Sequence, residues 1–106
     1  MIRILYRREE NAHLLMMDGH AEYDGHGRDI VCAGASAIVC ALLGWLENNS
    51  DDLEYVSEDV HAGDAKIACE GGEKTATAFE VTIIGLLQLA DSYPSHVEIE
   101  TIGLAD

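Results

Sequence analysis

The sequence predicts an α+β fold, an α/β two-layer sandwich in which an antiparallel or mixed five-stranded sheet packs against two helices. Three observations predict it. Several segments alternate apolar and polar residues with a period of two, as half-buried strands do. Residues 30–48 and 75–93 are long, apolar and free of proline. The links between successive strands are short enough for hairpins. The element order is therefore β-β-α-β-β-α-β.

The N-terminal half begins with a predicted hairpin. Residues 1–8 and 13–21 form its two strands, and residues 9–12 form the turn. Residues 22–29 have no apolar periodicity and contain Gly25 and Gly27, which predicts a mobile loop. Asp29 is a suitable N-cap for a helix that runs through Glu47 or Asn48 and ends in the turn-forming residues 48–52.

The C-terminal half repeats the pattern. Residues 53–60 and 62–71 are predicted strands whose Val56, Ile67 and Cys69 face inward. The second helix is expected to be capped by Thr75 or Thr77 and to stop before the single proline at position 94. Residues 96–102 alternate apolar and acidic side chains and predict a last, half-buried strand. We expect one domain over residues 1–106, the usual size for a single core.

The charge balance excludes direct nucleic-acid binding. The chain of 106 residues has 6 basic and 20 acidic residues, a net charge of −14, and its few arginines and lysines are too scattered for a basic footprint. Such acidity keeps a small protein soluble and would also steer basic partners toward it.

The cysteines and the N-terminus indicate a cytoplasmic protein. The three cysteines are an odd number without a CxxC pair, which argues against a disulfide framework. The first residues lack the apolar core of a signal peptide. Between Ile30 and Leu46 only Ser36 is polar, which approaches a membrane-spanning length. Two glycines and the lack of basic flanks favour a buried helix instead. Helices this apolar exceed what one sheet face covers, so we expect a homodimer and no membrane contact.

The junction between the glycine loop and the first helix carries the candidate chemistry. Cys32 is expected near the third position of the helix, where the helix dipole favours a thiolate. If the loop folds back, His20 approaches the sulfur and forms the pair that cysteine hydrolases use. Backbone N–H groups near Cys32 and Ala33 would then face the oxyanion of an attacked carbonyl.

Asp29 has two possible roles, because its carboxylate either caps the helix or orients His20. His26 could replace His20 as the base. A zinc site from His20, His26 and Cys32 is the metal alternative, but its spacing matches no structural zinc pattern, so we expect no metal and no cofactor. We expect Cys40 and Cys69 to be core residues, and the three remaining histidines, His13, His61 and His96, to need no function.

The motif resembles the signature of the ribosomal-processing cysteine protease Prp family. It consists of Gly19-His20-Ala21, then a loop, then residues 27–33 with the letters GRDIVCA, then Ser36-Ala37. The likeness implies a homodimeric α/β protein with His20 and Cys32 as the catalytic pair. It also implies that residues 22–28, including Tyr23, Gly25 and Gly27, close over the substrate. Ser36 and Ala33 would line the substrate pocket.

The resemblance further implies a substrate and leaves rivals. Family members remove a short N-terminal extension, after an aromatic pair, from a basic ribosomal protein of the bacterial large subunit. The competing interpretations are a non-catalytic ribosome-assembly or binding module with the same fold, and a thiol redox sensor based on Cys32.

Overall fold

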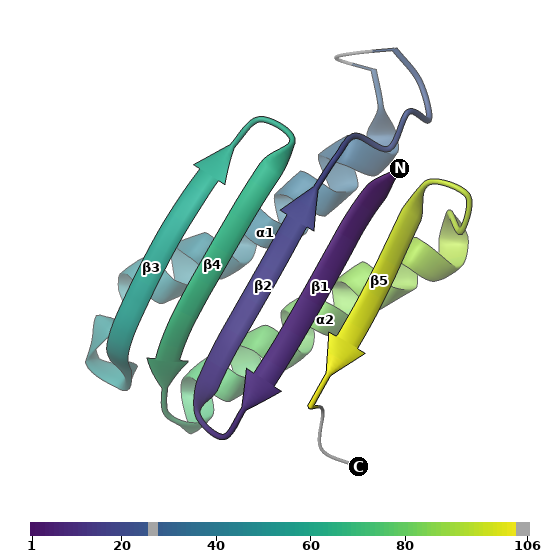
Figure 1. Cartoon of the computed structure of the whole chain (residues 1–106). Coiled ribbons are helices and arrows are strands. Elements are labelled where there is room, and N and C mark those ends of the chain that lie inside the picture. Colours follow the sequence, from purple (N-terminus) through teal and green to yellow (C-terminus); the bar gives the residue numbers. More distant parts are fainter. Residues whose placement is uncertain (26–27, 104–106) are drawn as a thin grey trace.

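Five strands form one mixed sheet in the order β3-β4-β2-β1-β5. The computed structural model describes residues 1–25 and 28–103, and Figure 1 shows both helices on the same face of the sheet. The strands are β1 (Ile2–Glu9), β2 (Ala12–Asp18), β3 (Leu53–His61), β4 (Asp64–Gly71) and β5 (Val97–Ile102). This architecture confirms the predicted α+β class and the predicted element order.

The sheet is antiparallel except at one edge. Strand β1 pairs antiparallel with β2 and parallel with β5, with Ile2 opposite Val97. The parallel pair needs a crossover, which the second helix, α2 (Glu73–Ser92), supplies between β4 and β5. In β1 the side chains of Ile2, Ile4 and Tyr6 are buried and alternate with exposed or half-buried ones, so the period of two predicted the inward face correctly.

The first helix, α1 (Ile30–Asn48), supplies half of the helix layer. Its buried residues recur every three or four positions and pack in the core: Val31, Ala35, Val39, Leu42 and Leu46. By length and composition alone this helix could also cross a membrane, with a mean hydropathy of 1.9. A continuous stripe buried against the sheet is what a core helix of a two-layer fold requires, and it favours that interpretation.

The start of α2 differs from the prediction. The N-cap is Gly72, not Thr75 or Thr77, and Gly72 has no side chain that could cap. Asp52, in the short 3-10 helix at Ser50–Asp52, accepts hydrogen bonds from both the N–H and the hydroxyl of Thr75, each at 2.8 Å. These bonds, partial desolvation notwithstanding, keep the pKa of Asp52 below its usual value. A carboxylate from another segment therefore caps α2.

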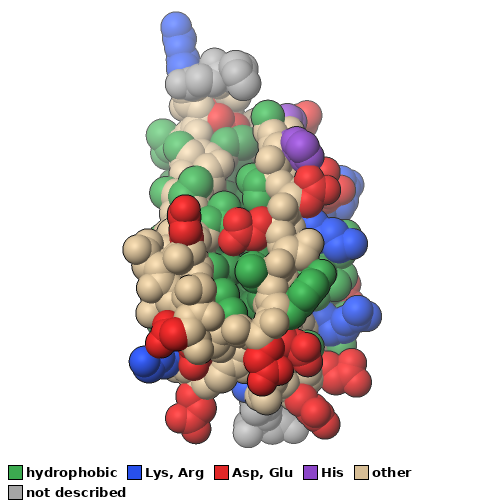
Figure 2. Space-filling model, turned by 90° about the vertical axis from the view of Figure 1, so that its left-hand side faces the viewer, with side chains coloured by type: hydrophobic (Ala, Val, Ile, Leu, Met, Phe, Trp, Pro, Cys, Tyr) green, Lys and Arg blue, Asp and Glu red, His purple; other side chains and the backbone are tan. Residues whose placement is uncertain are grey.

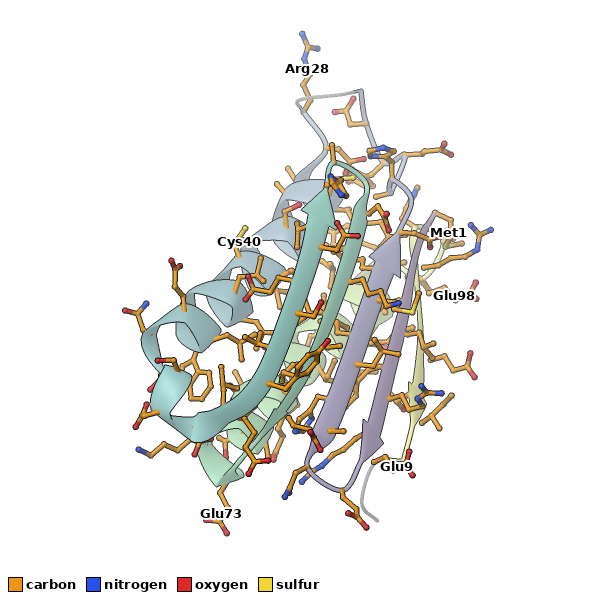
Figure 3. All side chains as sticks on the ribbon, turned by 60° about the vertical axis from the view of Figure 1, so that its left-hand side comes forward. Met1, Glu9, Arg28, Cys40, Glu73 and Glu98 are labelled. Atoms are coloured by element: carbon orange, nitrogen blue, oxygen red, sulfur yellow. The ribbon has the colours of Figure 1, made fainter. Side chains whose placement is uncertain are left out.

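Two residues expected in the core are exposed. Val56 is 43% exposed because β3 is an edge strand that the helix layer does not cover. Cys40 is exposed on α1, as Figure 3 also shows. Eight residues past Cys32 correspond to a turn of about 80° around the helix, which takes Cys40 off the buried stripe. Ile67 and Cys69 are buried as predicted.

Candidate active site

A cleft of about 610 Å³ lies between α1, the turn that joins β3 to β4, and the loop that follows β2. Figure 2 looks onto this side of the molecule and shows hydrophobic side chains gathered in a hollow between α1 and β3. The cleft is lined by Val39 and Leu43 of α1 and by Val60 and Ala65 of the β3–β4 hairpin, and its lining also includes acidic side chains. His20 and Cys32 both line it.

Cys32 is the third residue of α1 and is half-buried. Its sulfur accepts a hydrogen bond from the backbone N–H of Ala21, with nitrogen and Sγ 3.2 Å apart. This bond brings the chain next to His20 against the first turn of the helix. The N–H donor and the helix N-terminus each present positive partial charge to the sulfur.

His20 lies two residues beyond the end of β2, in the loop rather than on the strand where we expected it. Its backbone carbonyl accepts a hydrogen bond from the nitrogen of Met1 at 2.6 Å. Its ring lies against Gly63 in the β3–β4 turn, so close that a Cβ at Gly63 would be 2.7 Å from Nε2. The turn therefore packs directly against the imidazole, and both line the cleft.

Asp29 is the N-cap of α1. One carboxylate oxygen, Oδ1, accepts hydrogen bonds from the N–H groups of Val31 and Cys32, each at 3.0 Å. The other oxygen, Oδ2, accepts from Tyr23 at 2.9 Å and from Asp24 at 3.4 Å. Partial desolvation raises the pKa of Asp29, but the four backbone hydrogen bonds outweigh it and hold the pKa below its usual value. Every hydrogen bond that this carboxylate makes within the described chain goes to backbone N–H groups, and none goes to His20.

The first turn of α1 does not offer the free N–H groups that we expected near Cys32 and Ala33. The N–H of Cys32 is bonded to the side chain of Asp29, and that of Ala33 donates to the Asp29 carbonyl at 3.0 Å. The expectation was wrong because the cap satisfies these donors itself. The N–H of Ala21 is the backbone donor that faces the sulfur.

The remaining predicted residues separate into two groups. Ala33 and Ser36 are exposed and line the cleft beside Cys32. Tyr23 is 45% exposed and is not part of the cleft lining, and its ring makes edge-on contacts with Tyr93 and His96, each with ring centroids 5.3 Å apart.

The tip of the loop is only partly described. The carbonyl of Gly25 accepts a hydrogen bond from the N–H of Arg28, whose side chain points away from the body of the molecule in Figure 3. Gly27 and His26 lie outside the described residues, so the alternative base and the zinc set that includes it do too. Among the side chains in 1–25 and 28–103, no three histidines, cysteines or carboxylates are grouped to hold a metal.

Sequence reasoning missed two features of the site. Gly63 fell inside the predicted strand 62–71, yet it lies in the turn between β3 and β4 and contacts the His20 ring. His96 looked like a strand residue without a role, yet its Nδ1 atom is 2.9 Å from the carbonyl oxygen of Ala21. No local pattern reveals either contact, because both join segments that are distant in the sequence.

Comparisons with known proteins identify the family of this chain. The profile of the family "Cysteine protease Prp" matches residues 1–98. A ribosomal processing cysteine protease Prp of Mycoplasma pneumoniae is 36% identical over 89 residues, which cover 83% of this chain and 86% of the relative. The protein of the same name from Mycoplasma genitalium is 32% identical over 87 residues, covering 82% of this chain and 86% of the relative.

Solved structures share the fold. Prp from Staphylococcus aureus, in complex with a covalently linked product peptide, superimposes with a TM-score of 0.79 at 19% identity, covering 95% of this chain and 99% of that one. The protein SMU.848 from Streptococcus mutans gives a TM-score of 0.73 at 25% identity, covering 96% of this chain and 94% of its own. The profile match and the two Mycoplasma relatives together show that this chain belongs to the cysteine protease Prp family, a family of peptidases.

Proposed function

We propose that this protein is a cysteine endopeptidase that removes a short N-terminal extension from a bacterial large-subunit ribosomal protein, with Cys32 as nucleophile and His20 as general acid and base. One observation carries the proposal. The thiol at the start of α1 accepts a hydrogen bond from the residue next to His20, and both side chains line the same cleft. Thiol, imidazole and substrate-sized cavity therefore occur at one place.

The reaction follows the general chemistry of cysteine hydrolases. His20 takes the thiol proton, and the sulfur attacks the scissile carbonyl carbon to form a C–S bond and a tetrahedral oxyanion. His20 then protonates the leaving amine as the C–N bond breaks. Water, deprotonated by His20, attacks the resulting thioester, and the Cys32 thiolate leaves as the acid product forms.

The oxyanion needs a donor that the helix cap has not already used. The Ala21 N–H faces the sulfur, so it is placed to follow the charge as this moves from the thiolate to the carbonyl oxygen. A single preorganised donor of this kind contributes on the order of 100-fold to 1000-fold in kcat. Ala33 and Ser36 border the cleft where the substrate chain would lie, and the loop that carries Tyr23, Gly25 and Gly27 is proposed to close over it.

The substrate is inferred from the relatives and from charge. The Mycoplasma relatives are ribosomal processing cysteine proteases, and a Staphylococcus aureus Prp structure contains a substrate peptide. Ribosomal proteins are basic, whereas this chain has a net charge of −14. Long-range attraction between the two would speed capture of a cytoplasmic substrate.

The proposal is tested with a peptide that contains an N-terminal extension ending in an aromatic pair. Wild type is expected to cut it once, after that pair, while Cys32→Ala and His20→Ala are expected to leave it intact. Cleavage that survives Cys32→Ala would refute the protease assignment. A wild-type protein that binds the peptide without cutting it would instead favour a binding module with the same fold.

Electrostatic capture has its own test. We expect kcat/KM for the lysine-containing peptide to fall as salt rises from low to physiological concentration, because screening shortens the range of attraction. A matched peptide in which the lysines are replaced by glutamine should show little salt dependence. Equal salt dependence for the two peptides would show that the charge of the protein does not steer the substrate.

A further inference from the structure

Ala21, whose N–H faces the sulfur of Cys32, is held through its own carbonyl, in the next peptide group, by a third segment of the chain. Nδ1 of His96 is 2.9 Å from the carbonyl oxygen of Ala21, and the N–H of Ala21 is directed at Cys32 Sγ at 3.2 Å. His96 lies in the turn before β5, 75 residues away from Ala21. The turn before the last strand is thereby linked to the candidate nucleophile through one residue.

The carbonyl fixes the tautomer of His96. A carbonyl oxygen only accepts hydrogen bonds, so Nδ1 of His96 must carry the proton that it donates to Ala21. The contact is therefore one-directional, because His96 donates at Nδ1 in this neutral tautomer and in the charged ring alike. The proton on Nδ1 means that this nitrogen of His96 cannot act as a base.

His96 is itself rigidly placed. Its carbonyl accepts a hydrogen bond from the N–H of Ile2 in β1, and its N–H donates to the carbonyl of Tyr93, both at 2.9 Å. Its ring also contacts the ring of Tyr23 edge-on. A donor anchored to the sheet in this way positions its partner better than one on a free loop.

The backbone at Ala21 and Glu22, to which His96 is hydrogen-bonded, needs such support. Glu22 follows Ala21 and adopts a left-handed backbone conformation, with φ at 57°, which side-chain-bearing residues rarely adopt. Strained residues persist only where their neighbours hold them in place. Here His96 fixes the carbonyl of Ala21 on one side of Glu22, and Asp29 fixes the N–H of Tyr23 on the other.

We propose that His96 is a positioning residue of the active site, which aims the Ala21 N–H at the sulfur of Cys32 by holding the neighbouring carbonyl. This inference rests on the proposed role of Cys32 as nucleophile. The role of His96 is to keep a donor aligned, first with the thiolate and then with the oxyanion. It touches neither the substrate nor the reacting sulfur.

The test compares His96→Phe, His96→Asn and His96→Gln with wild type in the full chain. Phenylalanine keeps a ring beside Tyr23 but has no donor. The side-chain amide of asparagine can place an N–H where Nδ1 lies, while that of glutamine extends toward the position of Nε2. The readout is the rate at which iodoacetamide modifies Cys32, followed by fragmentation mass spectrometry to separate Cys32 from the exposed Cys40.

The rate is measured at pH 7 and at about pH 9.5, where ordinary thiols are largely ionised. We expect His96→Phe and His96→Gln to lower the rate at pH 7 by roughly tenfold relative to that at high pH, the change expected when one hydrogen bond to a charged sulfur is lost. His96→Asn should keep most of the wild-type ratio, and kcat/KM for the peptide should follow the same order. The comparison of asparagine with glutamine holds even if the phenylalanine variant folds poorly.

Three results would overturn the inference: an unchanged ratio in His96→Phe, an equal loss of rate at both pH values, or no difference between asparagine and glutamine. Peptide cleavage is measured separately. If wild type fails to cleave while the alkylation ratios still depend on His96, the proposed protease function fails and the positioning role stands. If wild type cleaves and the ratios are unchanged, only the positioning role is lost.

Discussion

Oδ2 of Asp29 accepts a hydrogen bond from the backbone N–H of Tyr23 at 2.9 Å, so the residue that caps the helix of the nucleophile also holds the loop that follows His20. The other oxygen, Oδ1, serves the helix itself by accepting from Val31 and Cys32. One carboxylate therefore sets the position of the thiol and of the loop next to the imidazole. Of the two roles that the sequence left open for Asp29, the structure has the cap of the helix, and no hydrogen bond joins the carboxylate to His20 within residues 1–25 and 28–103.

Asp29→Asn and Asp29→Ala should separate the two functions of this carboxylate. Asparagine is as good an N-cap as aspartate, but its amide nitrogen cannot accept the N–H of Tyr23. We therefore expect Asp29→Asn to keep a Tm close to wild type while kcat/KM falls roughly tenfold, the loss expected when a hydrogen bond to a charged group is broken. Asp29→Ala should lower both. Thermal unfolding and peptide cleavage measure the two effects, and full activity in Asp29→Asn would show that the loop does not need this anchor.

The contact between His20 and Gly63 gives a second prediction. Gly63 has φ at 76°, and a Cβ there would approach Nε2 of His20 to 2.7 Å. We expect Gly63→Ala to destabilise the protein by about 1 kcal/mol through backbone strain. It should also lower kcat/KM more than that loss of stability explains, because the added methyl group must displace the imidazole from its observed position.

The matched control for Gly63→Ala is Gly44→Ala. A Cβ at Gly44 on α1 meets nothing within 4 Å, so this variant should retain wild-type kcat/KM. Urea unfolding gives the stability of each variant. Cleavage assays at low temperature without urea give its activity. Wild-type kcat/KM in Gly63→Ala would mean that the observed position of the His20 ring is irrelevant to catalysis.

The fold could be predicted from the sequence because its signals are local. Strand β1 shows its buried face as Ile2, Ile4 and Tyr6, and α1 is the longest apolar run in the chain. The parallel pairing of β1 with β5 joins the two ends of the chain, and no periodicity specifies it, which is why the prediction left the sheet antiparallel or mixed.

In the candidate site, too, the local features could be predicted and the tertiary contacts could not. The helix position of Cys32 and the cap by Asp29 follow from residues next to each other, and the structure has both as predicted. Gly63 and His96 reach the site only because the β3–β4 turn and the turn before β5 lie at the same end of the strands as the His20 loop (Figure 1). Tertiary contacts of this kind leave no spacing pattern in a single sequence.

Buried His13 predicts a loss of stability in mild acid. Its ring is 2% exposed and stacks on Phe79, its Nδ1 is 2.7 Å from the hydroxyl of Tyr6, and its Nε2 is buried without a partner among the described residues. Desolvation, with a smaller contribution from the charge of Arg8, lowers the pKa of His13 to about 4. The ring is therefore neutral in the folded protein at pH 5 and protonated in the unfolded chain.

Protonation of His13 favours the unfolded chain. Because the unfolded chain binds the proton more tightly, this contribution to stability is present above pH 6.5 and is lost as the pH falls toward 4. A shift from 6.5 to about 4 corresponds to on the order of 3 kcal/mol. Urea unfolding between pH 7 and pH 4.5 should show this decline, and the double variant Tyr6→Phe and His13→Phe, which removes the ring nitrogens together with the hydroxyl, should show much less of it. The same slope in both proteins would assign the acid sensitivity to other groups.

The exposed face of α2 gives the last prediction, which concerns the oligomeric state. Val81, Ile84 and Leu87 are 65%, 50% and 41% exposed and follow one another at helical spacing on the side away from the core. Exposed apolar stripes of this kind mark interfaces, and we expect a second copy of this chain to cover the stripe. Light scattering after size-exclusion chromatography should therefore give twice the mass of 11.5 kDa.

Val81→Asp combined with Ile84→Asp should give the monomer mass, since two charges at the centre of an apolar contact prevent association. Met16→Glu on β2, which is also exposed but lies on the opposite face of the sheet, should leave the dimer intact. A wild-type protein that is monomeric at all concentrations, or a dimer that survives the double substitution, would show that α2 does not form the interface.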